Sequence, residues 1–240
     1  MEIVAFLAAD LAYGRVQQIE KSLTALFAVM GGSPSAFVRD FNDARRKSLR
    51  AFKHRFTTGD DIADLLTLLR RILHKFGGIQ QFFVQGCDPA DKNIAPALSK
   101  FCASLCEMHA DEHNGRVTTG LQYLLASPDR GSPCKRLNLF LRWMVRKDQV
   151  DPGLWKSIDK AKLIVPLDVH MARLCRILGL YHQKKPSLAA ALKITESFLE
   201  INPPDPIKYD FALSRIGIVE GCNGKYTLRC RDCELQAFCK

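Results

Sequence analysis

The sequence predicts an all-α protein, and three observations carry this prediction. Apolar residues recur at helical spacing through most of the 240 residues, and runs that alternate apolar with polar residues never exceed a few positions. Acids precede many of these apolar runs, while bases, glycine or proline follow them, which is typical of helix ends. With 47% hydrophobic and 25% charged residues, the composition is that of a globular protein with a sizeable core.

The expected helices follow one another with short breaks. Residues 2–30 form two helices interrupted at "LAYGRV", because Gly14 weakens helix continuity. "TTGDDIADLLTLLRRILHKFGG" carries a complete set of start and stop signals. Further helices are expected in "IAPALSKFCASLCEMHA", "CKRLNLFLRWMVR", "LDVHMARLCRILGL", "SLAAALKITESFLEI" and "PIKYDFALSRIGIV". "GCDPADKN" is expected to be a polar loop, and "DPGLWKSI" to open a turn or short helix.

The charge balance favours a polyanionic partner. Lys and Arg outnumber Asp and Glu by 35 to 25, for a net charge of +10, and excess cations favour nucleic acid through counterion release. No Lys/Arg cluster adjoins a membrane-seeking stretch, no apolar run could span a bilayer, and the start shows no signal-peptide pattern. We therefore expect a soluble, cytoplasmic protein with no membrane partner.

Four of the nine cysteines fall in the tail "GCNGKYTLRCRDCELQAFCK". Cys222, Cys230, Cys233 and Cys239 form C-x7-C-x2-C-x5-C. Cytosolic chains seldom use disulfides, so metal binding is favoured over free or redox-paired thiols. Structural zinc sites often take their ligands from two C-x2-C pairs. This tail has one C-x2-C pair with a single cysteine on either side, which favours an iron–sulfur cluster over zinc. Zinc remains the alternative.

"LIVPLDVHMARLCRILGL" places an acid, Asp168, at the start of an apolar helix. Asp after Pro is a common helix start, where the carboxylate accepts hydrogen bonds from free backbone N–H groups. Leu167, Met171 and Leu174 follow at helical spacing. These residues alone predict a helix cap.

Two segments resemble the helix-hairpin-helix DNA glycosylase superfamily. "PLDVHMARL" is similar to the family's V-D-T-H-x-x-R-V segment, with Asp168 on the essential aspartate, His170 on the histidine and Arg173 on the arginine. The tail resembles the C-x6-C-x2-C-x5-C loop of the endonuclease III branch, with one extra residue in the first gap. The resemblance is close over residues 131–239 and loose over the N-terminal helices. Within the superfamily, the chain most resembles an uncharacterised bacterial branch.

The resemblance implies a base-excision repair enzyme. It predicts a helical domain over residues 1–218, with two subdomains around a central cleft, and a [4Fe-4S] loop over residues 219–240. Such a monomer would act, near the nucleoid, as a DNA glycosylase and AP lyase on a damaged base flipped from double-stranded DNA. Asp168 would stabilise positive charge on the sugar and orient or deprotonate the nucleophile.

The resemblance further implies a lysine nucleophile, for which Lys135 and Lys147 compete. Lys135 is preferred because a helix N-terminus and adjacent Arg136 lower a lysine pKa, whereas Lys147 lies at a helix end that stabilises the ammonium. Either lysine could instead be a solvated charge or a phosphate contact. The usual L-P-G-x-G hairpin is absent. The number of residues between Lys135 and Asp168 is larger than in endonuclease III and closer to that in the archaeal 8-oxoguanine DNA glycosylases. This likeness suggests an oxidised purine as the substrate.

The break after the first helix, "AADLAYGRVQQ", matches the place where the family inserts a side chain into DNA. Tyr13 could stack in the duplex, and Arg15 or Gln17 could reach a base or phosphate; the alternative is a core Tyr13 and a solvated Arg15. Residues 52–56, "FKHRF", interleave aromatic and basic residues, a weak nucleic-acid signal. Arg136, His170 and Arg173 complete the expected DNA-binding set.

Two other groups are expected to be core. Trp143 lies on an apolar-rich helix, where it is more often buried than a base platform. Cys102, Cys106 and His109 share a helix face and could bind metal, but such a set is more often buried core. Two other functions stay open: a monofunctional or non-catalytic nucleic-acid-binding iron–sulfur protein of the same fold, and a redox-responsive iron–sulfur protein.

Overall fold

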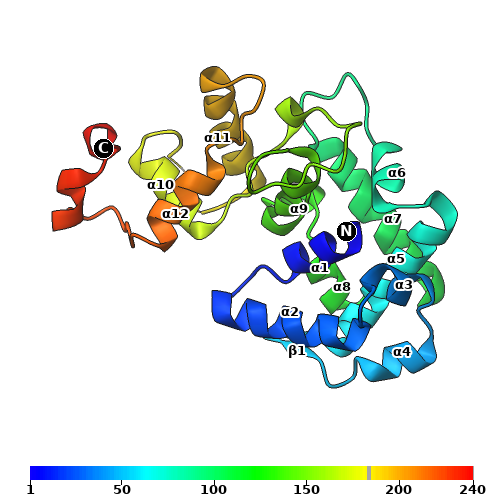
Figure 1. Cartoon of the computed structure of the whole chain (residues 1–240). Helices are drawn as coiled ribbons and strands as arrows, with labels where there is room; N and C mark the ends of the chain where they lie inside the picture. Colours follow the sequence, from blue (N-terminus) through cyan, green and yellow to red (C-terminus); the bar gives the residue numbers. More distant parts are fainter. Residues whose placement is uncertain (183–184, 240) are drawn as a thin grey trace.

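The computed structural model describes residues 1–182 and 185–239, and over these ranges the fold is all-α, as predicted, with one small hairpin (Figure 1). The helices are α1 (Glu2–Asp10), α2 (Val16–Met30), α3 (Pro34–Arg39), α4 (Asp43–Ser48), α5 (Gly59–Phe76), α6 (Ile79–Val84), α7 (Ala95–Glu112), α8 (Thr119–Leu124), α9 (Lys135–Val145), α10 (Val169–Ile177), α11 (Leu188–Ile201) and α12 (Asp210–Ile218). Short 3-10 turns lie at η1 (Pro128–Arg130), η2 (Lys160–Lys162), η3 (Leu228–Asp232) and η4 (Gln236–Phe238). The strands β1 (Lys53–His54) and β2 (Thr57–Thr58) pair antiparallel. No helix in the described ranges is long and apolar enough to cross a membrane.

The sequence signals set the helix ends where they are strongest. At the start of α5, the Thr58 hydroxyl accepts from the Asp61 N–H, and the Asp61 carboxylate accepts from the Thr58 N–H. The helix ends at Gly77, whose φ of +86° is a left-handed conformation that favours glycine. The predicted break between α1 and α2 is confirmed, and so is the polar loop over residues 86–93.

The prediction of a turn or short helix at "DPGLWKSI" is wrong. The backbone there is irregular, with a β-bridge at Pro152 and a positive φ at Gly153; Gly153 N–H donates to Trp143 O at 3.0 Å and Trp155 N–H donates to Met144 O at 2.7 Å. These two N–H groups donate to the last carbonyls of α9. They are therefore not available for hydrogen bonds within a helix over residues 151–158. The Trp155 ring is buried, and its indole N–H donates to Glu2 Oε1 at 2.6 Å.

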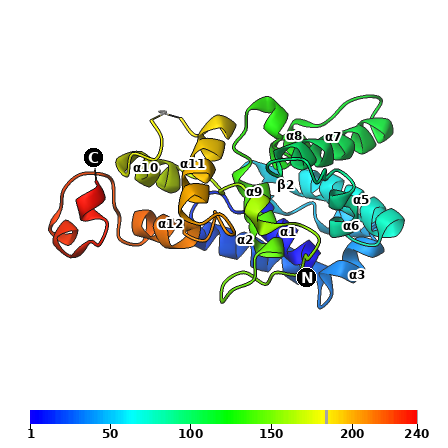
Figure 2. The same cartoon turned by 90° about the horizontal axis from the view of Figure 1, so that it is seen from above.

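The helices form two groups with α9 near the middle. Figures 1 and 2 both place α3, α5, α6 and α7 toward one end of the molecule, α10–α12 toward the other, and the cysteine tail beyond them. Helix α1 packs against α9, where the Phe6 and Phe140 rings meet edge to face at 5.0 Å. Helix α10 packs against α12.

A buried ion-pair network joins α9 to the second group. Arg142 pairs with Asp151, at 3.1 Å, and with Asp210, the first residue of α12. One turn later, Arg146 pairs with Asp151 and, at 2.8 Å, with Asp205. All five side chains are buried, so each charge depends on its partners in place of water. The network therefore holds residues 146–151 and the start of α12 against α9.

We expect Arg146→Met to lower the free energy of unfolding by about 3–5 kcal/mol, because it leaves Asp151 and Asp205 with one cation fewer in a buried site. The measurement is urea unfolding followed by circular dichroism at pH 7. Asp148→Asn is the matched control: Asp148 also pairs with Arg146, but its side chain is 39% exposed, so the loss should stay below about 1 kcal/mol. Equal losses in the two variants would contradict a buried network that matters for stability.

Candidate functional site

A cleft of about 1030 Å³ opens where the α1–α2 break, the start of α9 and the start of α10 meet. It brings together residues that are far apart in the sequence. Seven of the predicted site residues line it: Tyr13, Arg15, Gln17, Lys135, Arg136, Asp168 and His170. Arg173 and the competing lysine, Lys147, are not among the lining residues.

The turn before α9 aims Lys135 into this cleft. Cys134 adopts a left-handed conformation, with φ of +47°, which is unfavourable for a residue with a side chain. Its thiol donates to Ala126 O at 3.0 Å and its N–H donates to Ser132 Oγ at 3.1 Å, so the loop holds this conformation. Lys135 then reaches the α1–α2 break, where its Nζ donates to Ala12 O at 3.0 Å.

The surroundings of Lys135 favour a neutral amine. Burial lowers the pKa of Lys135, the negative charges of Asp168 and Asp210 oppose this, and the positive charge of Arg136 adds to it. The net direction is downward, as the sequence predicts, although burial rather than the helix N-terminus is the main cause. Lys147 is exposed beyond the end of α9, in a β-bridge with Pro152, so the structure does not place it in the cleft.

Asp168 is both a helix cap and a residue of the cleft. Its Oδ1 accepts from His170 N–H at 2.9 Å and from Met171 N–H at 2.8 Å, which confirms the predicted cap of α10. Both bonds fall on Oδ1, so Oδ2 takes no part in the cap. Capping thus fixes the carboxylate in orientation at the cleft without using both of its oxygens.

His170 lines the cleft with support from Arg173. Arg173 Nη2 donates to His170 Nδ1 at 3.1 Å. Because a guanidinium can only donate, Nδ1 accepts, and a neutral His170 carries its proton on Nε2. Gly217 of α12 lies against this histidine: a Cβ there would come within 2.9 Å of His170 Cβ, so the glycine permits α10 and α12 to pack closely. Arg173 therefore lies outside the cleft and orients the His170 ring through this hydrogen bond.

Tyr13 packs against the core, which is the alternative that the sequence left open, and does not extend from the cleft. Tyr13 is half-buried, and its hydroxyl lies 2.6 Å from Thr57 Oγ1 and 3.0 Å from His54 O. Its ring stacks on Phe56, with the centroids 5.2 Å apart, and meets Tyr123 edge to face at 5.4 Å. Phe56, in the turn between β1 and β2, is 55% exposed. Within this cluster Phe56 is the exposed ring, although it also meets Tyr123 edge to face with the centroids 4.5 Å apart. Its only sequence signal was the mixed "FKHRF" pattern.

Arg136 is held by the protein and is not free to contact phosphate. Its guanidinium donates to Asp10 O at 2.9 Å and to Tyr123 O, and it lies over the Tyr123 ring at 4.3 Å. Arg136 therefore joins α1, α8 and α9 at the back of the cleft. Arg15 and Gln17 are exposed at the edge of the cleft, as a contact with an external partner requires.

Asp210 is a site-associated residue that the sequence analysis did not single out. It is buried and bonded to Arg142, and burial raises its pKa to about 6 even though Arg142 opposes the rise. The charge of Asp168 adds to this rise, and Asp210 in turn affects Lys135. Asp210 thus lies within electrostatic range of both predicted catalytic residues. Its partner Arg142 comes from a distant segment, so no local pattern indicated it.

The tail cysteines share one region. Cys222, Cys230 and Cys233 line a pocket of about 530 Å³, and Thr227 N–H donates to Cys230 Sγ at 3.3 Å. Partial burial and the neighbouring Cys222, Cys233 and Cys230 raise the pKa of the exposed Cys239, so the four thiols influence one another. Their donor set fits an iron–sulfur cluster or zinc. Within residues 1–182 and 185–239, however, the group of three metal-ligating side chains whose ligand atoms lie within 4.8 Å of one another is at α5 and the C-terminal end of α7, not in the tail.

The cysteine–histidine face of α7 does not form a metal site of its own. Cys102 is buried, and burial raises the pKa of its thiol far above the usual value. His109 is also buried, but its ring faces Asp64 of α5. Trp143 is half-buried against the core, as predicted.

A family model described as "Protein of unknown function (DUF2400)" matches residues 1–219. The chain belongs to this family. The match spans the whole cleft and ends just before Cys222, so the cysteine tail lies outside it. No curated protein and no solved structure matches the chain.

Asp10 makes stability depend on pH. Both of its carboxylate oxygens are buried with no hydrogen-bond partner in the described residues, and burial raises its pKa from 3.8 to about 7 against the opposing charge of Arg136. A raised pKa contributes stability below about pH 4 that is lost as the pH rises through 7. We expect the unfolding free energy of the wild type, minus that of Asp10→Asn, to fall between pH 4 and pH 8.

The expected fall is a few kcal/mol, since one pKa unit corresponds to about 1.4 kcal/mol. Chemical denaturation at pH 4, 6 and 8 measures it. Asp111→Asn, at an exposed acid of α7, controls for the change in net charge. A difference between wild type and Asp10→Asn that does not change with pH would show that Asp10 is ionised in the folded protein.

Proposed function

We propose that the protein is a DNA base-excision glycosylase with AP lyase activity, which acts on a damaged base flipped into the cleft. One observation carries the proposal: a half-buried lysine with a lowered pKa and a helix-capping aspartate line the same cleft from different parts of the fold. This pairing is what excision through a covalent intermediate needs, because it supplies an amine nucleophile and a fixed negative charge.

In the proposed reaction, neutral Lys135 Nζ attacks the anomeric carbon of the flipped nucleotide. The Nζ–C1′ bond forms as the C1′–N bond to the base breaks, and the base leaves with the electron pair and takes up a proton. One proton of the bound amine passes to the leaving base and the other to O4′ as the C1′–O4′ bond breaks, so the opened sugar is held as a Schiff base. Loss of a C2′ proton to solvent then forms the C2′–C3′ double bond, and the C3′–O bond breaks with its electron pair leaving on the 3′ phosphate. Asp168 stabilises the positive charge that builds up on the sugar.

The charges around the cleft suit a nucleic acid. Arg15, Arg130 and Arg136 line it, Asp168 is the one acid among the described lining residues, and the whole chain carries a net charge of +10. Phe56 extends from the β1–β2 turn beside the cleft residue Tyr13, where an exposed aromatic ring can stack on an unpaired base. His170, with its proton on Nε2, can donate to a phosphate oxygen.

The proposal extends to cofactor, substrate class and location. The four tail thiols, Cys222, Cys230, Cys233 and Cys239, would hold a [4Fe-4S] cluster, with zinc as the alternative, and the bound group would cross-link the tail into one rigid loop. The substrate is proposed to be double-stranded DNA with an oxidised purine such as 8-oxoguanine. The enzyme would act as a monomer in the cytoplasm, at the nucleoid.

Borohydride trapping tests the nucleophile. Wild-type protein is incubated with abasic and lesion-bearing duplexes under borohydride, and we expect a covalent adduct that is lost in Lys135→Gln. Glutamine keeps an N–H donor for Ala12 O but cannot form a Schiff base. Lys147→Gln, the matched control at an exposed lysine, should trap as well as the wild type.

Two outcomes would contradict different parts of the proposal. No adduct on any duplex would contradict the lyase, and an adduct that persists in Lys135→Gln would contradict Lys135 as its nucleophile. Base release without an adduct would indicate a monofunctional glycosylase.

Phe56→Ala tests the stacking contact. We expect it to weaken binding to a lesion duplex by about 5- to 150-fold, since stacking on an aromatic side chain contributes about 1–3 kcal/mol per base. The dependence of affinity on salt should not change, because no charge is removed, whereas Arg15→Ala should reduce it. Fluorescence anisotropy at three salt concentrations measures both effects. Val150→Ala, at an exposed apolar residue after α9, is the control, and equal affinity of Phe56→Ala and this control would exclude the contact.

A further inference from the structure

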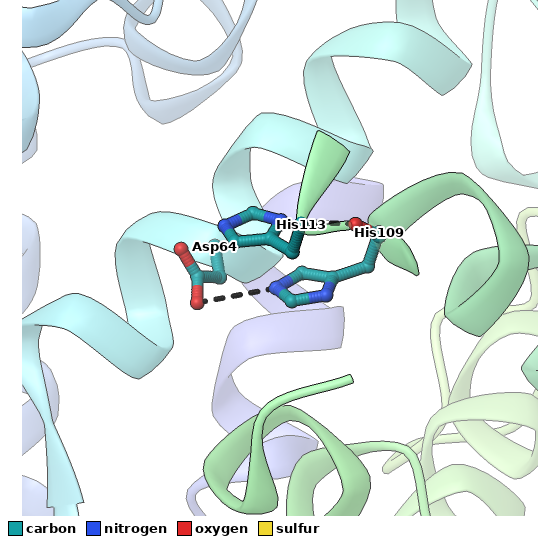
Figure 3. Close-up of side chains that lie close together, drawn as sticks. All are labelled: Asp64, His109 and His113. Atoms are coloured by element: carbon teal, nitrogen blue, oxygen red, sulfur yellow. Dashed lines mark hydrogen bonds and ion pairs between the residues drawn. The ribbon is translucent and has the colours of Figure 1, made fainter. Parts of the chain in front are cut away.

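Three side chains outside the cleft converge where α5 meets α7 (Figure 3). Asp64 comes from the first half of α5, and His109 and His113 lie one turn apart at the end of α7. One ligand atom from each lies within 4.8 Å of the others. Asp64 and His109 are buried, and His113 is partly exposed.

The hydrogen bonds determine where the lone pairs are. His109 Nδ1 lies 3.2 Å from Arg116 O, and His113 Nδ1 lies 2.9 Å from His109 O. A carbonyl oxygen only accepts, so both Nδ1 atoms carry protons. In neutral rings both Nε2 atoms then have free lone pairs, and His109 Nε2 lies 3.4 Å from Asp64 Oδ2, another acceptor.

Two facing acceptors repel unless a positive charge lies between them. We infer that Asp64, His109 and His113 bind a divalent transition metal, Zn²⁺ by its preference for imidazole and carboxylate. Two ligands about 2.1 Å from a tetrahedral zinc are about 3.4 Å apart, which matches the distance from Asp64 to His109. The rings of His109 and His113 stack 3.9 Å apart and 2° from parallel. Because a metal lies in the plane of each imidazole that binds it, and parallel planes do not meet, the more exposed His113 must turn out of this stack to bring its Nε2 to the ion.

The supporting contacts are those that metal ligands make. Each histidine donates its second ring nitrogen to a carbonyl, which is the usual arrangement around a bound metal. Asp64 Oδ1 accepts from Arg46 Nη2 at 2.8 Å, so the carboxylate is held from its other side. Three protein ligands with one partly exposed leave a fourth position for water.

The site would also stabilise the approach to the cleft. Arg71 of α5 donates to Met108 O of α7 at 2.7 Å, so the two helices are already joined here. Arg116, whose carbonyl holds His109, lies in the loop that leads into α8, and α8 supplies Tyr123 to the cleft. A metal at this point therefore fixes α5, α7 and that loop together. This inference does not depend on the proposed DNA reaction.

Cobalt substitution tests the site in the 240-residue chain, with the four tail cysteines first loaded with the proposed cluster or with zinc. After titration with Co²⁺, we expect one equivalent whose visible spectrum lacks thiolate-to-cobalt charge-transfer bands, which separates it from the cysteine tail. That equivalent should be lost in His113→Ala and Asp64→Asn and kept in His182→Ala, a matched change at an exposed histidine. Zn²⁺ should raise the Tm of the wild type and of His182→Ala but not of His113→Ala.

Two results would overturn the inference. One is no such equivalent in the wild type, together with a Tm that Zn²⁺ leaves unchanged. The other is equal binding in wild type and His113→Ala. Circular dichroism of each variant distinguishes loss of metal from loss of fold; because His113 is partly exposed, its alanine variant should remain folded.

Discussion

The buried ion pair between Arg142 and Asp210 is the constraint on which the geometry of the cleft depends. Arg142 lies two turns after Lys135 on α9, and Asp210 is the first residue of α12. Helix α12 packs closely on α10 at Gly217, and α10 begins with its cap Asp168. The pair thus fixes the position of Asp168 relative to Lys135. Separating it would leave buried charges unpaired at a cost of several kcal/mol, which disfavours any arrangement in which α12 moves away from α9.

The same helix also connects the cleft to the first group of helices. Lys135 and Arg136 donate to carbonyls at the end of α1, and Arg142 and Arg146 pair with acids of the second group. One lysine and three arginines of α9 and its C-cap therefore determine how the two groups meet. The N-terminal one is the proposed nucleophile, so its low-polarity surroundings, which favour the neutral amine, are a consequence of this packing.

Local patterns predicted the helices that carry strong signals at their ends. The capping residues of α5, the break at Gly14 and the cap at Asp168 involve neighbours within four residues, so the sequence displays them directly. The six-residue helices α3, α4, α6 and α8 are too short to show a period. The segment at Trp155 was misjudged because its backbone bonds go to the end of α9, a contact that the local sequence does not encode.

The residues of the site likewise divide into those that the sequence indicated and those that depend on contacts between distant segments. Resemblance to a known family indicated Lys135, Asp168 and His170, and the fold places them around one cleft. The sequence could not show that Tyr13 would be anchored by Thr57 while Phe56 stays exposed, since that depends on how the β1–β2 turn packs on the α1–α2 break. Asp210 and Asp64 were missed for the same reason: their partners, Arg142 and His109, lie far along the chain.

Lys135 and Asp168 line one cleft, and the pKa of this lysine tests most directly whether its amine can act there as the proposed nucleophile. The rate of acylation of Lys135, followed by peptide mass spectrometry across pH, reports that pKa. The account predicts a midpoint below the ordinary value of 10.5, and a still lower midpoint in Asp168→Asn, because the charge of Asp168 raises the pKa of Lys135. A midpoint at or above 10.5, or one that Asp168→Asn leaves unchanged, would contradict the account.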